Sequence, residues 1–367
     1  MAARCYLDTS SICRRARWDC EPSRDSLISV ISQIAVAHDR EHIFGANATQ
    51  VLKSLLESFL GFLPQLSAHD RLDIDWRLHP VFRKSVQGIC RFHGIRLVTF
   101  GGPSTTRASR HLRDRSPARV LIVPVTCWRT GQVLYGPEQI RKLHTDKPDS
   151  LVIADAVQCF GNIPRDLFRK LLRESHVDVV IGSVQKWLGI SRPLGIAWVS
   201  SDLLKKSPAM RDWLALNDCL GAAAGPRRIL RKFPDSFDAK GAQDIANEIK
   251  NRFPDKASID RHYRILEINT AFLRREFGCL TNCRLLDPNS TPAAVTAITS
   301  VSGPPSRLRR ISCSLREVGF PHSLLQGETE RQRANEVVLR ISSPLEEMRS
   351  TDRMVLERVL IPYRYRK

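Results

Sequence analysis

The sequence predicts an α/β fold with a mainly parallel central sheet, helices on both faces of that sheet, and a smaller α+β unit towards the C-terminal end. Three observations carry this prediction. Strand-like and helical segments alternate from residue 71 to 200, the strand-like segments are rich in β-branched residues with little polar alternation, and helices followed by short strands come afterwards. Strands covered by helices on both faces have that composition.

Two helices are predicted before this alternation. Residues 26–35, SLISVISQIA, predict an amphipathic helix. A second helix, with apolar residues at helical spacing, follows the small-residue turn GANAT at 45–49. Asn47 or Thr49 is expected to cap its start.

The alternating region predicts six strands separated by helices. The strands are RLDIDW (71–76), IRLVTF (95–100), RVLIVPV (119–125), SLVIADA (150–156), VDVVIGS (177–183) and LGIAWVS (194–200). The helices are HPVFRKSVQGICRFHG (79–94), in which Gly94 is the expected stop, GPEQIRKLHT (136–145) and PRDLFRKLLRES (164–175).

The rest of the chain predicts long helices and then a mixed unit. Helices are expected at 238–253, 259–277, 305–319 and 351–361, and strands at 293–301 and 336–342. We therefore divide the chain into an N-terminal segment (1–25), a large domain (26–265) and a small C-terminal domain (266–367).

Composition excludes several classes of protein. The 367 residues are 42% hydrophobic and 26% charged, which is typical of a folded globular protein. No apolar stretch is long enough to span a bilayer, and the start lacks the apolar centre of a secretory signal, so we expect a cytoplasmic protein with no membrane partner. The ten cysteines are scattered without a CxxC pair, which favours reduced thiols over a disulfide framework or a zinc site.

The charge balance favours anionic partners. The formal net charge is +19 and the sequence pI is about 10.0, but lysines and arginines are spread along the whole chain. No nucleic-acid-binding motif accompanies them, so nucleic-acid binding is not expected. Binding of an acidic protein partner or an anionic cofactor would explain part of this positive charge. The alternative explanation is an arginine-rich composition without any such partner.

Polar residues follow two of the predicted buried strands. Asp155 and Gln158 end one segment, and Ser183, Gln185 and Lys186 end another. Each group alone has a structural explanation, as a helix cap or a solvated turn. Ligands of such sheets, however, bind beyond the carboxyl ends of the strands.

One ligand explains these groups together with the GANAT turn. The helix start at Ala48 and Thr49 offers free backbone N–H groups for a phosphate, to which Ser183 can add a hydroxyl. Asp155 can pair with a protonated ring nitrogen, and Lys186 can form a Schiff base with an aldehyde. A phosphate, a ring nitrogen and an aldehyde together describe pyridoxal 5′-phosphate (PLP).

The same segments resemble the class V aminotransferase family, which includes cysteine desulfurases, isopenicillin-N-epimerase-like enzymes and kynureninases. The similarity lies in IADAVQCFGNIP and VIGSVQKWLG, where Asp155 and Lys186 are 31 positions apart. It extends to further segments: YLDTSS near the start, ANATQ, RTGQVLYGPEQI and VVLRISSP.

The resemblance implies a PLP-dependent transferase of the type I fold, with the active site at the interface of a homodimer. It gives phosphate contacts to Ala48 and Thr49, and binding of the substrate α-carboxylate to Arg340. It also implies that His79 stacks on the cofactor ring and that Gln158 hydrogen-bonds the ring hydroxyl.

The chain departs from the family pattern at several positions. Gln185 stands where the family has a histidine that helps to hold the phosphate, although an amide can still donate a hydrogen bond to it. No GT turn lies near 235–245, and no cysteine lies at 320–335, where desulfurases keep their sulfur acceptor. Trp128 replaces a small polar residue, which implies an altered substrate pocket.

The predicted activity is that of a PLP-dependent enzyme acting at Cα of an amino acid or amine through Lys186. Lys186 is expected to move the Cα proton as general base. Transamination is favoured on its frequency in the family, and a lyase or epimerase reaction is the alternative. A catalytically degenerate relative that binds an acidic partner is the alternative from another class.

Overall fold

A computed structural model describes residues 25–37, 40–62, 71–101, 120–206, 239–286, 296–326 and 337–364. The predicted N-terminal segment, including YLDTSS, lies outside the described residues except for residue 25. Most of the predicted helices and strands lie inside them.

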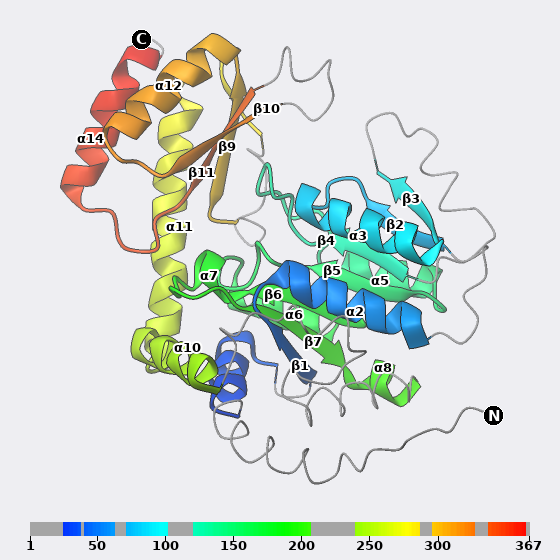
Figure 1. Ribbon diagram of the computed structural model, residues 1–367. Coiled ribbons are helices and arrows are strands. Elements are labelled where there is room, and N and C mark those ends of the chain that lie inside the picture. The colour runs from blue at the N-terminus through cyan, green and yellow to red at the C-terminus, as the bar shows by residue number, and fades with distance from the viewer. Residues whose placement is uncertain are drawn as a thin grey trace, which may run out of the picture.

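The larger of two sheets has seven strands (Figure 1). In spatial order they are β1 (Arg40–Gly45), β7 (Gly195–Ser200), β6 (Val179–Ser183), β5 (Leu151–Asp155), β4 (Val120–Pro124), β2 (Arg71–Asp75) and β3 (Arg96–Phe100). The pairs from β6 through β3 are parallel, whereas β7 is antiparallel to both β6 and β1. The prediction of a mainly parallel sheet is confirmed.

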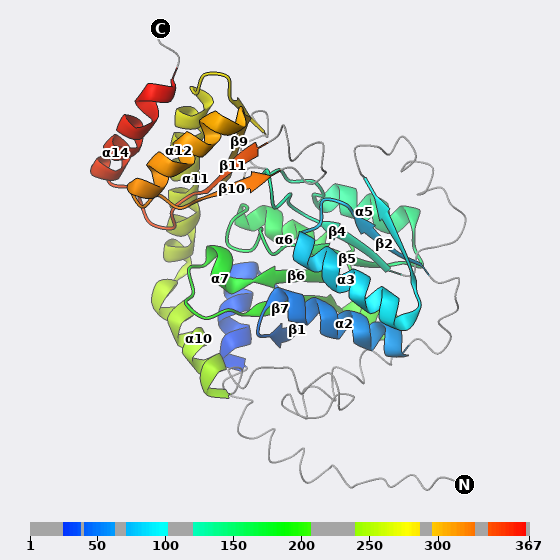
Figure 2. The same ribbon diagram turned by 45° about the horizontal axis from the view of Figure 1, so that its top comes forward.

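Helices cover both faces of this sheet (Figure 2). Ile122 and Ile153 pack in one apolar core with the helices α2 (Ala48–Phe62) and α3 (Pro80–His93). Their neighbours Leu121 and Val152 pack in a second core on the other face. This alternation follows from the two-residue repeat of a strand. The second core is covered by a helix over residues 25–35 and by α5 (Pro137–Asp146), α6 (Arg165–Arg173) and α10 (Ala239–Arg252).

One of the strands expected to be covered on both faces is not. β2, β4, β5 and β6 are buried along their whole length, but β3 is buried only at Phe100. Among the strands that the structure describes, β3 pairs with β2 alone, at the edge of the sheet. Its apolar residues therefore gave a misleading signal of double-sided burial.

The second sheet is smaller and antiparallel. Its spatial order is β10 (His322–Gln326), β11 (Val337–Ser342), β9 (Ile298–Gly303) and β8 (Arg284–Leu285). Its core also contains residues of α12 (Pro305–Glu317) and α14 (Ser350–Leu360), which ends in the short 3-10 turn η4 (Ile361–Tyr363). This agrees with the α+β unit expected at the C-terminal end.

A single long helix, α11 (Lys256–Gly278), connects the two sheets (Figure 1). The Asp255 side chain caps its start by accepting a hydrogen bond from the Ser258 backbone N–H at 2.7 Å. Ile259 packs in the core of the large sheet, and Phe272 packs in that of the small sheet. The domain boundary at residue 265 stays a prediction, and α11 crosses it without a break.

The end of α3 shows how local sequence fixes an element. Gly94 has φ +68° and closes the helix through its N–H, which donates to the Cys90 carbonyl oxygen. This left-handed conformation disfavours a residue with a side chain. Gly88, in the interior of the same helix, is exposed and has a right-handed helical backbone. A Cβ added at either glycine has no other atom within 4 Å.

These two glycines give a matched pair of stability predictions. Gly94→Ala is expected to destabilise the protein by about 1 kcal/mol, because alanine resists the left-handed backbone. Gly88→Ala is expected to stabilise it by roughly 0.5–1 kcal/mol, because alanine favours a helix interior. Urea unfolding of both variants measures the difference, and changes of the same sign would contradict this account of the cap.

Candidate active site

The predicted functional residues gather at the carboxyl ends of the parallel strands. Asp155 is the last residue of β5, and Ser183 is the last residue of β6, its parallel neighbour. The short helix α7 (Val184–Trp187) follows Ser183 directly and carries Lys186 in its single turn. The carboxyl ends of neighbouring parallel strands lie at one edge of a sheet, so the fold brings these residues together.

Asp155 and Lys186 influence each other electrostatically. Burial raises the pKa of Asp155 to about 7, against the opposing effects of a hydrogen bond from the Val157 backbone N–H and of the charge on Lys186. The Lys186 side chain is exposed, yet the surrounding protein lowers the pKa of its amine. The charge of Arg340 lowers this pKa further, and Asp155 raises it. A lowered pKa increases the fraction of amine that is neutral and nucleophilic.

Arg340 reaches this edge from the small sheet. It lies in β11, and its Nη2 atom is 3.5 Å from Gln158 Oε1, across 182 positions of sequence. Its Nε atom is buried and has no hydrogen-bond partner within the part of the chain that the structure describes. Burial lowers the pKa of Arg340, with Cys127 acting in the opposite direction. A partly buried guanidinium that has no acidic partner among the described residues is suited to binding a carboxylate.

His79 lies at the same edge, at the start of α3. Its Nδ1 atom accepts a hydrogen bond from the Val81 backbone N–H at 3.3 Å. Burial lowers the pKa of His79 to about 4, and the positive charges of Lys186, Arg340 and Arg83 act in the same direction. Its ring is therefore neutral at physiological pH.

Trp128 packs against His79. The two rings meet edge to face, with centroids 5.1 Å apart and an interplanar angle of 67°. Trp128 lies four residues after the end of β4, and His79 lies between β2 and α3. The aromatic contact therefore links the connection after β4 with the connection after β2. The expectation that Trp128 alters the substrate pocket stays a prediction.

The start of α2 lies against the beginning of β7. Asn47 caps this helix by accepting a hydrogen bond from the Gln50 backbone N–H at 3.0 Å, so Asn47 rather than Thr49 is the cap. Gly195 pairs with Ser183 in the sheet, and a Cβ at Gly195 would lie 2.4 Å from the backbone nitrogen of Ala48. Only a glycine lets the start of α2 approach β6 and β7 so closely.

Ser183 and Gln185 bind each other beside this helix start. Ser183 Oγ donates to Gln185 Oε1 at 2.5 Å, and the Leu194 backbone N–H donates to the same oxygen at 3.1 Å. The hydroxyl proton of Ser183 is thus occupied, whereas the amide hydrogens of Gln185 are left for another acceptor. Phosphate binding by Ala48, Thr49, Ser183 and Gln185 stays a prediction.

Sequence reasoning missed two residues that shape this site. Gly195 was assigned only to a strand, although a glycine at the start of a buried strand signals a close backbone approach. Trp187 was noted only as part of the QKW motif. Its Nε1 atom donates to Gln158 Oε1 at 3.1 Å, a contact that sequence spacing does not reveal.

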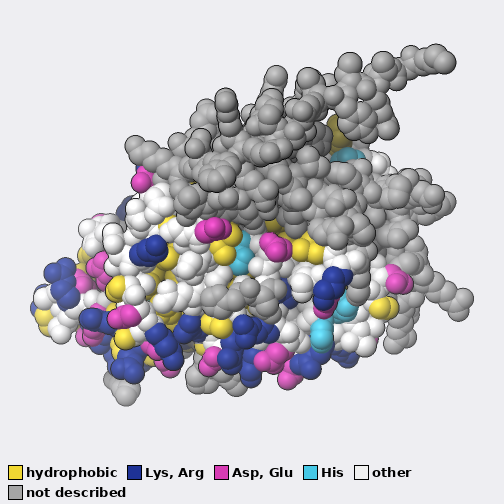
Figure 3. Space-filling model, turned by 90° about the horizontal axis from the view of Figure 1, so that it is seen from below, with side chains coloured by type: hydrophobic (Ala, Val, Ile, Leu, Met, Phe, Trp, Pro, Cys, Tyr) yellow, Lys and Arg dark blue, Asp and Glu magenta, His cyan; other side chains and the backbone are white. Residues whose placement is uncertain are grey.

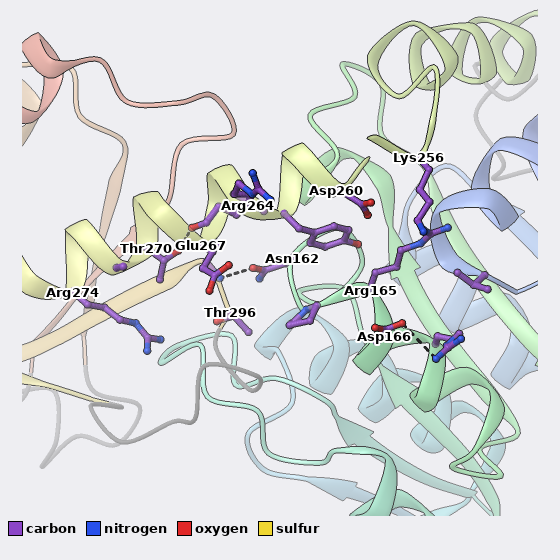
Figure 4. A pocket seen from close by; sticks show the side chains of 17 residues that line it. Asn162, Arg165, Asp166, Lys256, Asp260, Arg264, Glu267, Thr270, Arg274 and Thr296 are labelled. Atoms are coloured by element: carbon purple, nitrogen blue, oxygen red, sulfur yellow. Dashed lines mark hydrogen bonds and ion pairs between the residues drawn. The ribbon is translucent and has the colours of Figure 1, made fainter. Parts of the chain in front are cut away.

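A separate hollow of about 1100 Å³ lies between α6 and α11 (Figure 4). Charged side chains of both signs line it, among them Arg165, Asp166, Asp260 and Glu267. None of the predicted site residues lines it. Asn162 belongs to its wall and also donates from Nδ2 to the Gln158 carbonyl oxygen at 2.7 Å.

The surface of the described residues is mixed in charge. On the face in Figure 3, Lys and Arg side chains alternate with Asp and Glu rather than forming one basic patch. Within the described ranges, no helix is both long and apolar enough to cross a membrane.

Comparisons with known proteins identify the fold. No protein-family model matches the sequence, and no curated protein matches it. Solved structures do match. Serine palmitoyltransferase from Sphingomonas wittichii has a TM-score of 0.64 at 14% identity, over 93% of this chain and 77% of that one. A phosphoserine aminotransferase from Cytophaga hutchinsonii has a TM-score of 0.62 at 15% identity, over 95% and 89%.

A third structure is a mutant of C-DES with glycine covalently linked to its PLP cofactor. Its TM-score is 0.68 at 16% identity, over 94% of this chain and 87% of that one. These similarities confirm the type I fold of PLP-dependent transferases. At such identities they show the fold alone, so the narrower resemblance to class V stays a prediction.

The buried acid gives a testable pH dependence. Because the folded pKa of Asp155 is about 7, above the unfolded value, Asp155 stabilises the ligand-free fold below about pH 4 and loses this contribution as pH rises through 7. Asp155→Asn removes the effect. The stability of the variant relative to the wild type is expected to grow by roughly 1.4 kcal/mol per pH unit between about pH 4 and 7. Urea unfolding across this range measures it, and a constant difference would contradict the assigned burial.

Proposed function

We propose that this protein is a PLP-dependent enzyme that acts at Cα of an amino acid or amine substrate, and that its reaction is transamination. One observation carries the proposal. A buried carboxylate, Asp155, ends β5, and an amine of lowered pKa, Lys186, follows the end of the neighbouring strand β6 in a type I fold. Arg340 enters the same edge, and its buried Nε atom has no hydrogen-bond partner among the described residues.

The residues present fit the cofactor. Asp155 is 8% exposed, and burial raises its pKa even though the charge of Lys186 opposes this. A protonated pyridine nitrogen beside this carboxylate would favour its charged form. Gly195 allows the start of α2 to approach the end of β6, where a phosphate would receive backbone N–H groups.

Each residue then has a distinct task. When bound at Lys186, PLP supplies an electron-withdrawing ring that stabilises negative charge at the substrate Cα. Asp155 would hold the proton of the ring nitrogen, and Gln158 would donate to the ring oxygen. Lys186, whose pKa is lowered, would take the Cα proton as general base once the substrate amine has replaced its own amine on the cofactor.

The remaining residues orient the substrate. Arg340 binds the substrate carboxylate, and its buried Nε atom gains a partner in doing so. His79 packs on the cofactor ring as a neutral imidazole, since its pKa of about 4 keeps a further positive charge away from Lys186. Trp128 restricts the space beside His79 and so limits which side chains the substrate can carry.

Several finer assignments belong to the same proposal. The class V relationship, the homodimer and the cytoplasmic location rest on the sequence resemblance and on composition. A β-eliminating or epimerising reaction would use the same residues, so product analysis with and without an added keto acid separates these reactions from transamination.

Lys186 is the first test. Wild-type protein incubated with PLP should become yellow, and borohydride reduction should fix the cofactor to the chain. Lys186→Ala should abolish this fixation, because the amine is lost, whereas Lys205→Ala, at an exposed lysine of α8 (Ser201–Lys206), should not. Mass spectrometry of the reduced protein measures the linkage. A wild type that takes up no PLP would contradict the proposal and favour a degenerate binding protein.

Arg340 is the second test. Arg340→Gln should leave borohydride fixation of PLP intact but raise the KM for amino acid substrates by at least about tenfold, because a charge-assisted pair with the carboxylate is lost. Amine substrates without a carboxylate should be affected much less. Steady-state kinetics with both substrate types measure the split, and equal losses for both would show that Arg340 does not bind the carboxylate.

A further inference from the structure

The amide group of Gln158 is held in one orientation. Trp187 Nε1 donates to Gln158 Oε1 at 3.1 Å, and Arg340 Nη2 lies 3.5 Å from the same oxygen. An indole N–H and a guanidinium can only donate, so the amide must turn its oxygen towards them. Its Nε2 atom therefore faces the other way, and it has no partner among the residues that the structure describes.

Trp187 is the stronger of the two donors. Its distance of 3.1 Å lies in the normal range for an N–H···O hydrogen bond, whereas 3.5 Å is at the limit of such a contact. Trp187 is also firmly packed. It is 3% exposed and lies in a small apolar core with Leu266 of α11 and with Ala297 and Ile298 beside the small sheet.

The backbone of Gln158 is fixed as well. Its carbonyl oxygen accepts a hydrogen bond from Asn162 Nδ2 at 2.7 Å, and Asn162 Oδ1 accepts one from the Ala297 backbone N–H. Both ends of the glutamine are thus tied to groups that pack next to the small sheet. The Trp187 N–H then restricts rotation of the terminal amide by holding its oxygen.

We infer that Trp187 is a positioning residue, whose indole N–H fixes the Gln158 amide so that it presents a donor rather than an acceptor to the cofactor site. The inference rests on the proposed function, because the donor is useful only if the cofactor's ring oxygen lies there.

Trp187→Phe tests the inference, because it keeps an aromatic ring and removes the N–H. Trp198→Phe is the matched control, since Trp198 is fully buried and its Nε1 atom has no partner within the described residues. Trp187→Phe should still fix PLP at Lys186, but its affinity for PLP should be about three- to tenfold weaker than that of the control. The pH midpoint of the visible cofactor band should rise by about half a pH unit, because the deprotonated ring oxygen loses a donor.

A double-mutant cycle separates positioning from packing. In a Gln158→Ala background, Trp187→Phe should have no further effect on either measurement, because the amide that it positions is gone. Gln158→Glu provides an independent check that leaves Trp187 in place. It puts an oxygen on the cofactor side in either orientation, so it should weaken PLP binding by about tenfold or more.

The outcomes distinguish the inference from the proposed function. If wild-type protein fixes PLP but Trp187→Phe binds it like Trp198→Phe, or if its effect persists in Gln158→Ala, the inference is wrong and the proposed function stands. If wild-type protein fixes no PLP, the proposed function is wrong and this inference falls with it.

Discussion

The site depends on one electrostatic constraint, the burial of a carboxylate at the end of a parallel strand. Asp155 lies where three buried strands end, and burial raises its pKa to about 7 against the opposing effects of Lys186 and a backbone hydrogen bond. Two cations, Lys186 and Arg340, lie close enough for the charge of Arg340 to lower the pKa of the Lys186 amine, and the surrounding protein lowers the pKa of both groups. Such an arrangement of ionisable groups costs stability without a ligand, and clusters of this kind are typical of functional sites.

The small sheet completes this arrangement, and its docking is specified by polar contacts with the large one. Thr296 Oγ1 donates to the Gly131 carbonyl oxygen at 2.7 Å, and Ser300 Oγ donates to the Arg129 carbonyl oxygen at 2.7 Å. Both contacts hold the loop after β4, which also carries Trp128. The position of Arg340 and the shape of the aromatic wall are therefore coupled, because the same docking fixes both.

The fold was predictable from the sequence because buried strands and amphipathic helices have distinct periodicities. The placement of Asp155 and Lys186 at one edge of the sheet was predictable, because Asp155 ends one predicted strand and Lys186 comes shortly after the next. The contact between Arg340 and Gln158 spans 182 positions, so no local pattern indicates it, and the family resemblance alone suggested a shared site. The close approach at Gly195 and the edge position of β3 depend on which strands become neighbours, which composition does not specify.

Hydrogen bonds determine which polar atom of the Gln185 amide is left for another partner. A glutamine could turn either its oxygen or its nitrogen towards an anion. Here the Ser183 hydroxyl and the Leu194 backbone N–H both donate to its oxygen, so the amide nitrogen is the group left for another partner. Gln158 is oriented in the same way by Trp187 and Arg340. The oxygens of both glutamines are occupied, so each offers its amide nitrogen as a hydrogen-bond donor. Asp155 offers an acceptor at the same edge of the sheet. An anionic ligand with a protonated ring requires both kinds of group.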